Sequence, residues 1–198
     1  LLWGAGAAGA GIIEDLGPEM WFNATVTSSL TVNGSNQVSA WADLANPGRV
    51  AATTAGSGVV LANNGPYGSA SVDFTAAGTL SFGGVNQVST NKTVFALFQT
   101  NDTNISWTNP IGGNYHLTDG DNKGYRGFVR SGGALRIQPK LSRVNDWVIQ
   151  TMEYDIGDRY SLWVGGNLEG TVSNTNSTDP LGGLGQSNFN GSISQVLV

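Results

Sequence analysis

The chain has 198 residues, a net charge of −5 and only 12% charged residues. Its nine Lys and Arg residues are scattered singly, which argues against a nucleic-acid interface, and no apolar run approaches the roughly 18 residues of a membrane span. The absence of cysteine excludes a disulfide scaffold, a thiolate zinc site and a cysteine nucleophile. The chain contains six Trp and seven Phe, which predict a packed β-protein core. Its surface should be polar but uncharged, because Gly, Asn, Ser and Thr are abundant, and such surfaces are common on extracellular and virion proteins.

The first seventeen residues differ from the rest of the chain. They are mainly glycine and alanine, which bury little side-chain surface, and glycine is entropically costly to order. Such a segment is either a linker or an arm that becomes ordered against another protein. We expect residues 1–17 to form an assembly arm that contacts a partner through its few large residues, which are Leu1, Leu2, Trp3, Ile12 and Ile13.

From Pro18 onward, short apolar strands alternate with turn signals, and no helical period is sustained over three turns. This pattern predicts one all-β domain over residues 18–198, folded as a two-sheet antiparallel sandwich. The two most continuous apolar runs, 93–99 and 147–154, should be central strands. The other expected strands are 20–23, 30–32, 37–42, 58–61, 71–74, 79–82, 126–130, 134–139, 160–164, 168–172 and 192–198.

Large apolar residues on these strands should fill the space between the two sheets. We therefore expect burial at seven positions: Trp41, Phe74, Phe95, Phe98, Trp147, Trp163 and Val196.

The segment between Asn101 and Gly124 is predicted to be a long loop with two possible roles. Its aromatic and polar residues would suit a sugar site, because a ring stacks on apolar sugar faces while carboxylates bind hydroxyls; alternatively, the rings cover a sheet edge. The sugar-site candidates in and beside the loop are Trp107, Tyr115, His116, Asp119 and Tyr125.

A calcium ion is the only cofactor that the same loop suggests. Asp119, Asp121 and Asn122 offer oxygen ligands, although the pattern also fits an Asp-Gly turn with solvated carboxylates. His116 has no partner at a recognisable spacing, so we interpret it as a loop residue rather than a zinc ligand or general base.

The C-terminal region contains two turn-and-strand patterns. Gly165-Gly166 separates two short strands, and a two-residue glycine turn accommodates positive φ at both central positions. Asn190-Gly191 precedes a final strand whose apolar residues Ile193, Val196 and Val198 fall mostly on one face. This closing half resembles a concanavalin A-like (laminin G-like) jelly-roll domain, in which such a hairpin precedes an "F-x-G-x-I-x-x-V-x-V" strand.

The front half carries the same resemblance. Trp21 followed by Val38-Ser-Ala-Trp41-Ala-Asp43 is similar to the family's "W-x-D … V-x-x-W-x-D" opening, with Phe22-Asn23 replacing the aspartate that usually comes after the first Trp. The passage from Pro66-Tyr67 to Val72-Asp73-Phe74 is similar to the family's "P-x-Y … x-V-x-F" segment, and residues 92–98 are similar to its next core strand. The Gly/Ala-rich lead-in looks most like the tailed-phage members.

The resemblance implies a non-enzymatic virion structural protein of a tailed bacteriophage, a capsid-decoration or tail-fibre component with a lectin-like domain. Its expected partners are other virion proteins, reached through the arm, and host-surface or environmental glycans, and we expect a homo-oligomer or a multi-copy assembly. The alternative is a secreted carbohydrate-binding module.

A second alternative is a glycoside hydrolase, because laminarinase-type enzymes on this fold carry an "E-x-D-x-x-E" strand. Glu153 and Asp155 alternate and would share one sheet face, and Asp158 stands where the last carboxylate is expected. Gly157 before the shorter Asp158 indicates a hairpin tip instead, so we expect no catalysis from these residues.

Overall fold

The computed structural model describes residues 13, 15–53, 58–75, 78–85, 91–101, 109–112, 115–119, 125–131, 133–137, 145–155, 159–173, 181–186 and 189–198. Within them, two short 3-10 turns lie at Thr27–Ser29 and Pro66–Gly68. The structure contains no helix, among these residues, with the length and apolar character that a membrane crossing requires.

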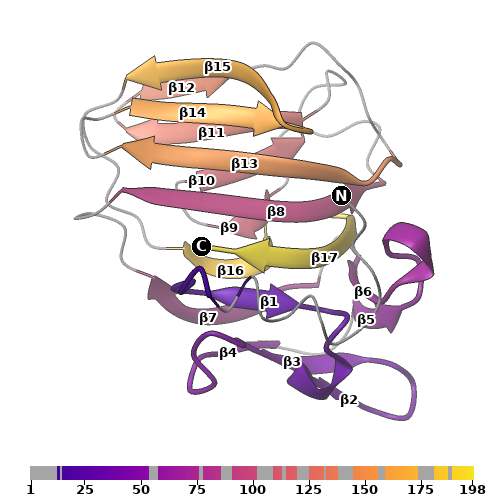
Figure 1. Ribbon diagram of the computed structural model, residues 1–198. Helices are drawn as coiled ribbons and strands as arrows, with labels where there is room; N and C mark the ends of the chain where they lie inside the picture. The colour runs from indigo at the N-terminus through magenta and orange to yellow at the C-terminus, as the bar shows by residue number, and fades with distance from the viewer. Residues whose placement is uncertain are drawn as a thin grey trace.

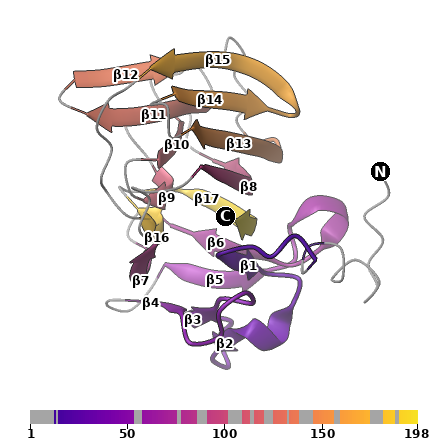
Figure 2. The same ribbon diagram turned by 60° about the vertical axis from the view of Figure 1, so that its left-hand side comes forward.

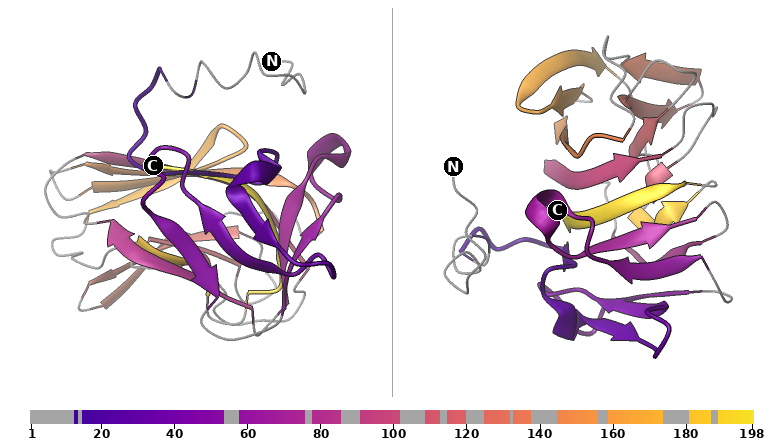
Figure 3. Two further views of the ribbon diagram at one scale, coloured as in Figure 1. Left: turned by 90° about the horizontal axis from the view of Figure 1, so that it is seen from below. Right: turned by 90° about the vertical axis from the view of Figure 1, so that its right-hand side faces the viewer.

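The chain folds into two layers of antiparallel strands, which Figure 3 shows edge-on in its left view. The first layer is an eight-stranded sheet in which β1 (Trp21–Asn23) also pairs with β17. Its other strands are, in spatial order, β15 (Asn167–Ser173), β14 (Arg159–Val164), β13 (Val148–Asp155), β8 (Lys92–Thr100), β17 (Gly191–Leu197), β6 (Ser71–Phe74) and β5 (Val59–Ala62).

The second layer lies behind the first in Figure 1. Its six-stranded sheet has the order β2 (Leu30–Val32), β3 (Val38–Ala42), β4 (Val50–Thr53), β7 (Leu80–Val85), β16 (Leu181–Gln186) and β9 (Asn109–Gly112). A three-stranded sheet of β10 (Tyr115–Asp119), β11 (Tyr125–Ser131) and β12 (Gly133–Ile137) continues beside β9 and faces β13, β14 and β15 (Figure 2). The predicted all-β sandwich is confirmed, with β8 and β13 as central strands.

The predicted hairpin around Gly165-Gly166 is also confirmed. These glycines join β14 to β15 with φ values of 57° and 83°, so both occupy the left-handed region that a two-residue hairpin turn of this kind requires.

Four strands of the structure were not predicted: β4, β9, β10 and β16. The last of these reads Leu-Gly-Gly-Leu-Gly-Gln and lacks the β-branched residues that mark a strand. Gly185 has a φ of 68°, and a side chain there would overlap the Phe74 ring. Close contact with the opposite sheet therefore explains the glycine at position 185, in a strand that propensity alone assigns to a loop.

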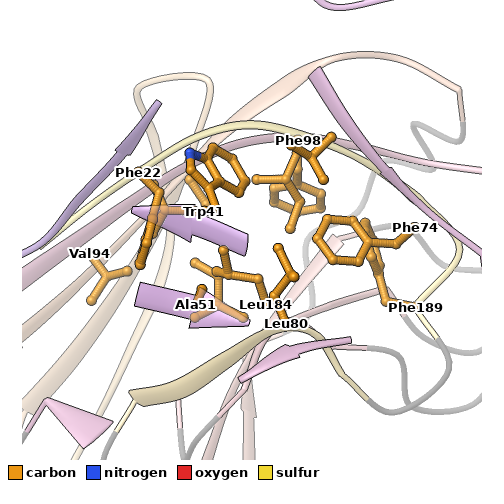
Figure 4. Close-up of a cluster of buried hydrophobic side chains, with 14 of the residues drawn as sticks. Phe22, Trp41, Ala51, Phe74, Leu80, Val94, Phe98, Leu184 and Phe189 are labelled. Carbon is orange, nitrogen blue, oxygen red and sulfur yellow. The ribbon is translucent and has the colours of Figure 1, made fainter. Parts of the chain in front are cut away.

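The core between the layers is rich in aromatic residues (Figure 4). Phe22 lies against Trp41 and Phe82 with ring centroids 5.6 and 5.4 Å apart, and Phe189 contacts Phe74 and Phe98. Burial is confirmed for four predicted core residues, which are Trp41, Phe74, Phe98 and Val196.

The core prediction is wrong for three residues. Phe95 is 41% exposed, and Trp147 and Trp163 are only half-buried. The reason is strand alternation: Val94, Ala96 and Phe98 point into the core, so Phe95 points away from it. The same alternation on β14 turns Trp163 away from the second layer, because its neighbours Leu162 and Val164 are buried.

Asp43 of the front motif joins Trp21 to the turn that follows β3. Its Oδ1 accepts hydrogen bonds from the backbone N–H groups of Trp21 (2.8 Å) and Ala45 (2.9 Å). Its Oδ2 lies 2.7 Å from the Arg49 guanidinium, which also donates to the Glu19 carbonyl. The motif therefore ties the start of β1 to the hairpin after β3.

The N-terminal arm can be followed only from Ile13, because Leu1, Leu2, Trp3 and Ile12 lie outside the described residues. Ile13 is buried, with 7% of its surface exposed, yet it does not belong to the core cluster between the sheets. The segment that leads into β1 runs on the side of the eight-stranded sheet that faces away from the second layer (Figure 3). The assembly role of the arm stays a prediction.

Candidate functional site

The eight-stranded sheet has one face on the core and one directed away from it, which we call the outer face. Paired residues on neighbouring antiparallel strands point to the same side, so the register identifies which side chains meet there. On β13, Val148, Gln150 and Met152 are buried in the core, whereas Ile149 and Glu153 are exposed on the outer face.

A row of mainly apolar side chains crosses this outer face at right angles to the strands. Thr151 on β13 pairs with Phe95 on one side and with Trp163 on the other. Trp163 pairs in turn with Leu168 on β15, and Phe95 pairs with Leu197 on β17. We call these five residues the apolar row. Phe95 is 41% exposed and Leu168 is 52% exposed, so the row is open to solvent at these two positions.

Polar groups accompany the row. The indole N–H of Trp163 donates to Glu153 Oε2 at 3.2 Å, which holds the ring beside an exposed carboxylate. Further along the same strands, the hydroxyls of Ser161 and Thr171 lie 3.1 Å apart. A carboxylate has about four acceptor positions, so Glu153 keeps acceptor capacity for a ligand hydroxyl. The arrangement combines ring faces with hydrogen-bonding groups.

A second polar group lies toward one end of the outer face and supports the loop between β5 and β6. Asn64 donates to Asp73 Oδ2 at 3.0 Å, and Ser71 donates to both Asp73 and Asn64. The indole of Trp147 donates to the Asn64 carbonyl at 3.0 Å. These contacts anchor a loop whose tip carries Tyr67, fully exposed at a φ of 58°.

The carboxylates considered for catalysis lie at the predicted hairpin. β13 ends at Asp155 and β14 begins at Arg159, and these two residues pair across the strands. Asp155 forms an ion pair with Arg159 at 3.4 Å, and Glu153 accepts the Trp163 N–H. Asp158 lies outside the described residues. Glu153 therefore orients an aromatic ring in this structure.

The described loop candidates fall on β10, a strand that was not predicted, and on the first residue of β11, a strand that was predicted over 126–130. Tyr115, His116 and Asp119 lie on β10, and Tyr125 opens β11 opposite Asp119. Backbone pairing thus places Asp119 beside Tyr125, with Tyr115 at the other end of β10. Trp107 lies outside the described residues, so its sugar-binding role stays a prediction.

The calcium hypothesis also stays a prediction, because Asp121 and Asn122 lie outside the described residues. Within the described part of the chain, no group of three or more His, Asp or Glu side chains is arranged to hold a metal ion.

The outer-face residues were not recognised as a site from the sequence, and Phe95 and Trp163 were assigned to the core. A signal was present in β14, where Tyr160, Leu162 and Val164 alternate with Arg159, Ser161 and Trp163. The consistently apolar set identifies the core side, which leaves Trp163 outside.

Comparison with solved structures reveals neighbours that share the fold at low sequence identity. Domain 4 of AbnA, an extracellular GH43 arabinanase from Geobacillus stearothermophilus solved with arabinotriose, gives a TM-score of 0.57 at 11% identity, over 72% of this chain and 75% of that chain. The ligand-binding domain of botulinum neurotoxin serotype D, solved with N-acetylneuraminic acid, gives 0.60 at 13% identity, over 94% of this chain and 48% of that chain. Trypanosoma rangeli sialidase gives 0.59 at 12% identity, over 92% of this chain and 30% of that chain.

By sequence, no protein-family model matches the chain, and no curated protein matches it. The structural likeness therefore establishes a β-sandwich that is also found in domains solved with bound sugars.

Proposed function

We propose that this chain is a non-catalytic, glycan-binding β-sandwich module that binds sugars on the outer face of its eight-stranded sheet. The observation that carries the proposal is the apolar row, in which Phe95 is exposed and Trp163 is held beside the Glu153 carboxylate. Ring faces pack on the C–H faces of pyranoses, while carboxylates and hydroxyls bind sugar hydroxyls.

Two of the three carboxylates considered for catalysis, Glu153 and Asp155, lie within the described residues, and each has a partner. This supports a binding module rather than an enzyme. Asp155 is paired with Arg159, and Glu153 accepts the Trp163 indole N–H. Two neighbouring structures that share the fold are themselves sugar-bound domains, one of an arabinanase and one of a neurotoxin.

A glycan array tests the proposal. We expect the wild-type chain to bind at least one glycan class, and Trp163→Ala to weaken that binding at least about tenfold, because a stacking surface is lost. Tyr67→Ala is the control, because it also removes an exposed aromatic ring, but one on the β5–β6 loop outside the apolar row. This variant should bind like the wild type. A reducing-sugar assay on the bound glycan should detect no hydrolysis. Absence of binding to every glycan would refute the proposed function.

We further propose that the module is displayed on the exterior of a tailed-phage virion, the secreted module being the alternative. The support is the Gly/Ala-rich arm at residues 1–17, ahead of the sandwich, whose named large residues form two short groups at 1–3 and 12–13.

Deletion of residues 1–11 should leave a folded domain, because the truncation ends before buried Ile13. The truncated chain should lose incorporation into its particle, or its oligomeric state, measured by particle purification and native mass spectrometry. Incorporation at the wild-type level would contradict the assembly role of the arm.

A further inference from the structure

The spacing within the apolar row restricts the kind of glycan that fits it. Phe95 and Trp163 pair with the same residue, Thr151, from opposite sides. Their strands, β8 and β14, are therefore separated by two strand spacings, which is about 9.6 Å. Both side chains are on the outer face, so the two residues stand on one line across the sheet with this interval between their backbones.

From this interval we infer that the ligand is an extended, neutral β-1,4-linked pyranose chain lying across the strands; the inference rests on the proposed function. In such a chain each sugar is turned by about half a revolution relative to its neighbour, so equivalent faces recur at every second sugar. That repeat is comparable to two strand spacings, about 10 Å. Phe95 and Trp163 would then contact alternate sugars, with the middle sugar above Thr151.

The flanking residues extend the same line. Leu168 continues the row beyond Trp163, and Leu197 continues it beyond Phe95. At the far end, Trp21 pairs with Leu197 but is only 3% exposed, so the open part of the row ends near β17. The exposed track from Leu168 to Phe95 spans three strand spacings, about 14 Å, which suits a short stretch of extended chain.

The charges of the outer face favour a neutral ligand. Glu153 lies beside Trp163, where the carboxylate of an acidic sugar would be repelled. Among the described side chains that the strands present on this face, Arg159 is the one cation, and it is already paired with Asp155. A sialylated ligand would therefore meet no free cation in the described row, whereas neutral hydroxyls can donate to Glu153.

The distinguishing experiment measures affinity against ligand length. Isothermal titration with cello-, xylo- and chito-oligosaccharides, from disaccharide to hexasaccharide, should show affinity rising at least about tenfold once a ligand is long enough to contact both rings. Maltohexaose, which coils, and sialyllactose, which is anionic, should bind at least about tenfold more weakly than the best β-1,4 hexasaccharide.

Two variants test whether the rings act as a pair. Phe95→Ala should abolish the gain with length while leaving weak disaccharide binding, and Trp163→Ala should do the same. Tyr67→Ala should retain the full length dependence, because its ring lies on the β5–β6 loop. Thermal unfolding of each variant establishes that the comparison is made on folded protein.

The outcomes separate the two proposals. Binding of an α-linked or sialylated glycan through Trp163 would overturn the inferred ligand class and leave the glycan-binding function standing. Binding of β-1,4 oligosaccharides with a length dependence unchanged in Phe95→Ala would overturn the paired-ring geometry. Absence of binding to every oligosaccharide and array glycan would overturn both.

Discussion

Replacing Trp41 with alanine should lower the free energy of unfolding by about 3–5 kcal/mol, because a large cavity would open in the centre of the sandwich. The side chain is fully buried, and its ring packs against Phe22 at 5.6 Å between centroids. For a domain of this size the loss corresponds to a fall in melting temperature of roughly 6–20 °C. Chemical denaturation of the wild type and the variant, analysed with one common m-value, measures the change in the free energy of unfolding.

Trp147→Ala is the matched control, since it removes the same side chain from a half-buried site on the outer face. Its clearest loss is the 3.0 Å hydrogen bond to the Asn64 carbonyl, so we expect a cost nearer about 1 kcal/mol. Equal destabilisation by the two substitutions would contradict the division between core and outer face.

Replacing Asp43 with alanine should destabilise the protein by about 3–5 kcal/mol, because it breaks a buried ion pair and leaves its partners unsatisfied. The Asp43 side chain is fully buried and that of Arg49 is 17% exposed, with 2.7 Å between their atoms. The N–H groups of Trp21 and Ala45 would also lose their acceptor. Denaturant unfolding and hydrogen exchange at the Trp21 amide measure the effect.

Asp155→Ala supplies the comparison for this prediction. It also removes an aspartate that pairs with an arginine, but both side chains are about half exposed and their atoms lie 3.4 Å apart. Exposed ion pairs of this kind contribute at most about 1 kcal/mol. If Asp43→Ala proved no more destabilising than Asp155→Ala, Asp43 would not be the buried anchor of the front motif.

Turn chemistry and apolar alternation determined the fold class from the sequence. Gly165-Gly166 predicted a hairpin because only glycine adopts positive φ there at little cost, and the structure has that hairpin. The front motif likewise predicted a family-like opening, in which Asp43 proves to be the residue that holds Trp21 and Arg49 together.

The outer face, and with it the candidate site, was decided by the tertiary structure. Strand alternation assigns residues to two faces, but it does not say which face meets the core when both are apolar. On β8 one face carries Val94 and Phe98 and the other carries Phe95 and Leu97, so only pairing with β13 and β17 and packing against the second layer distinguish them. Strand β16 was missed for a related reason: its glycine-rich sequence has little strand propensity of its own, and it is a strand because it pairs with β7 and β9.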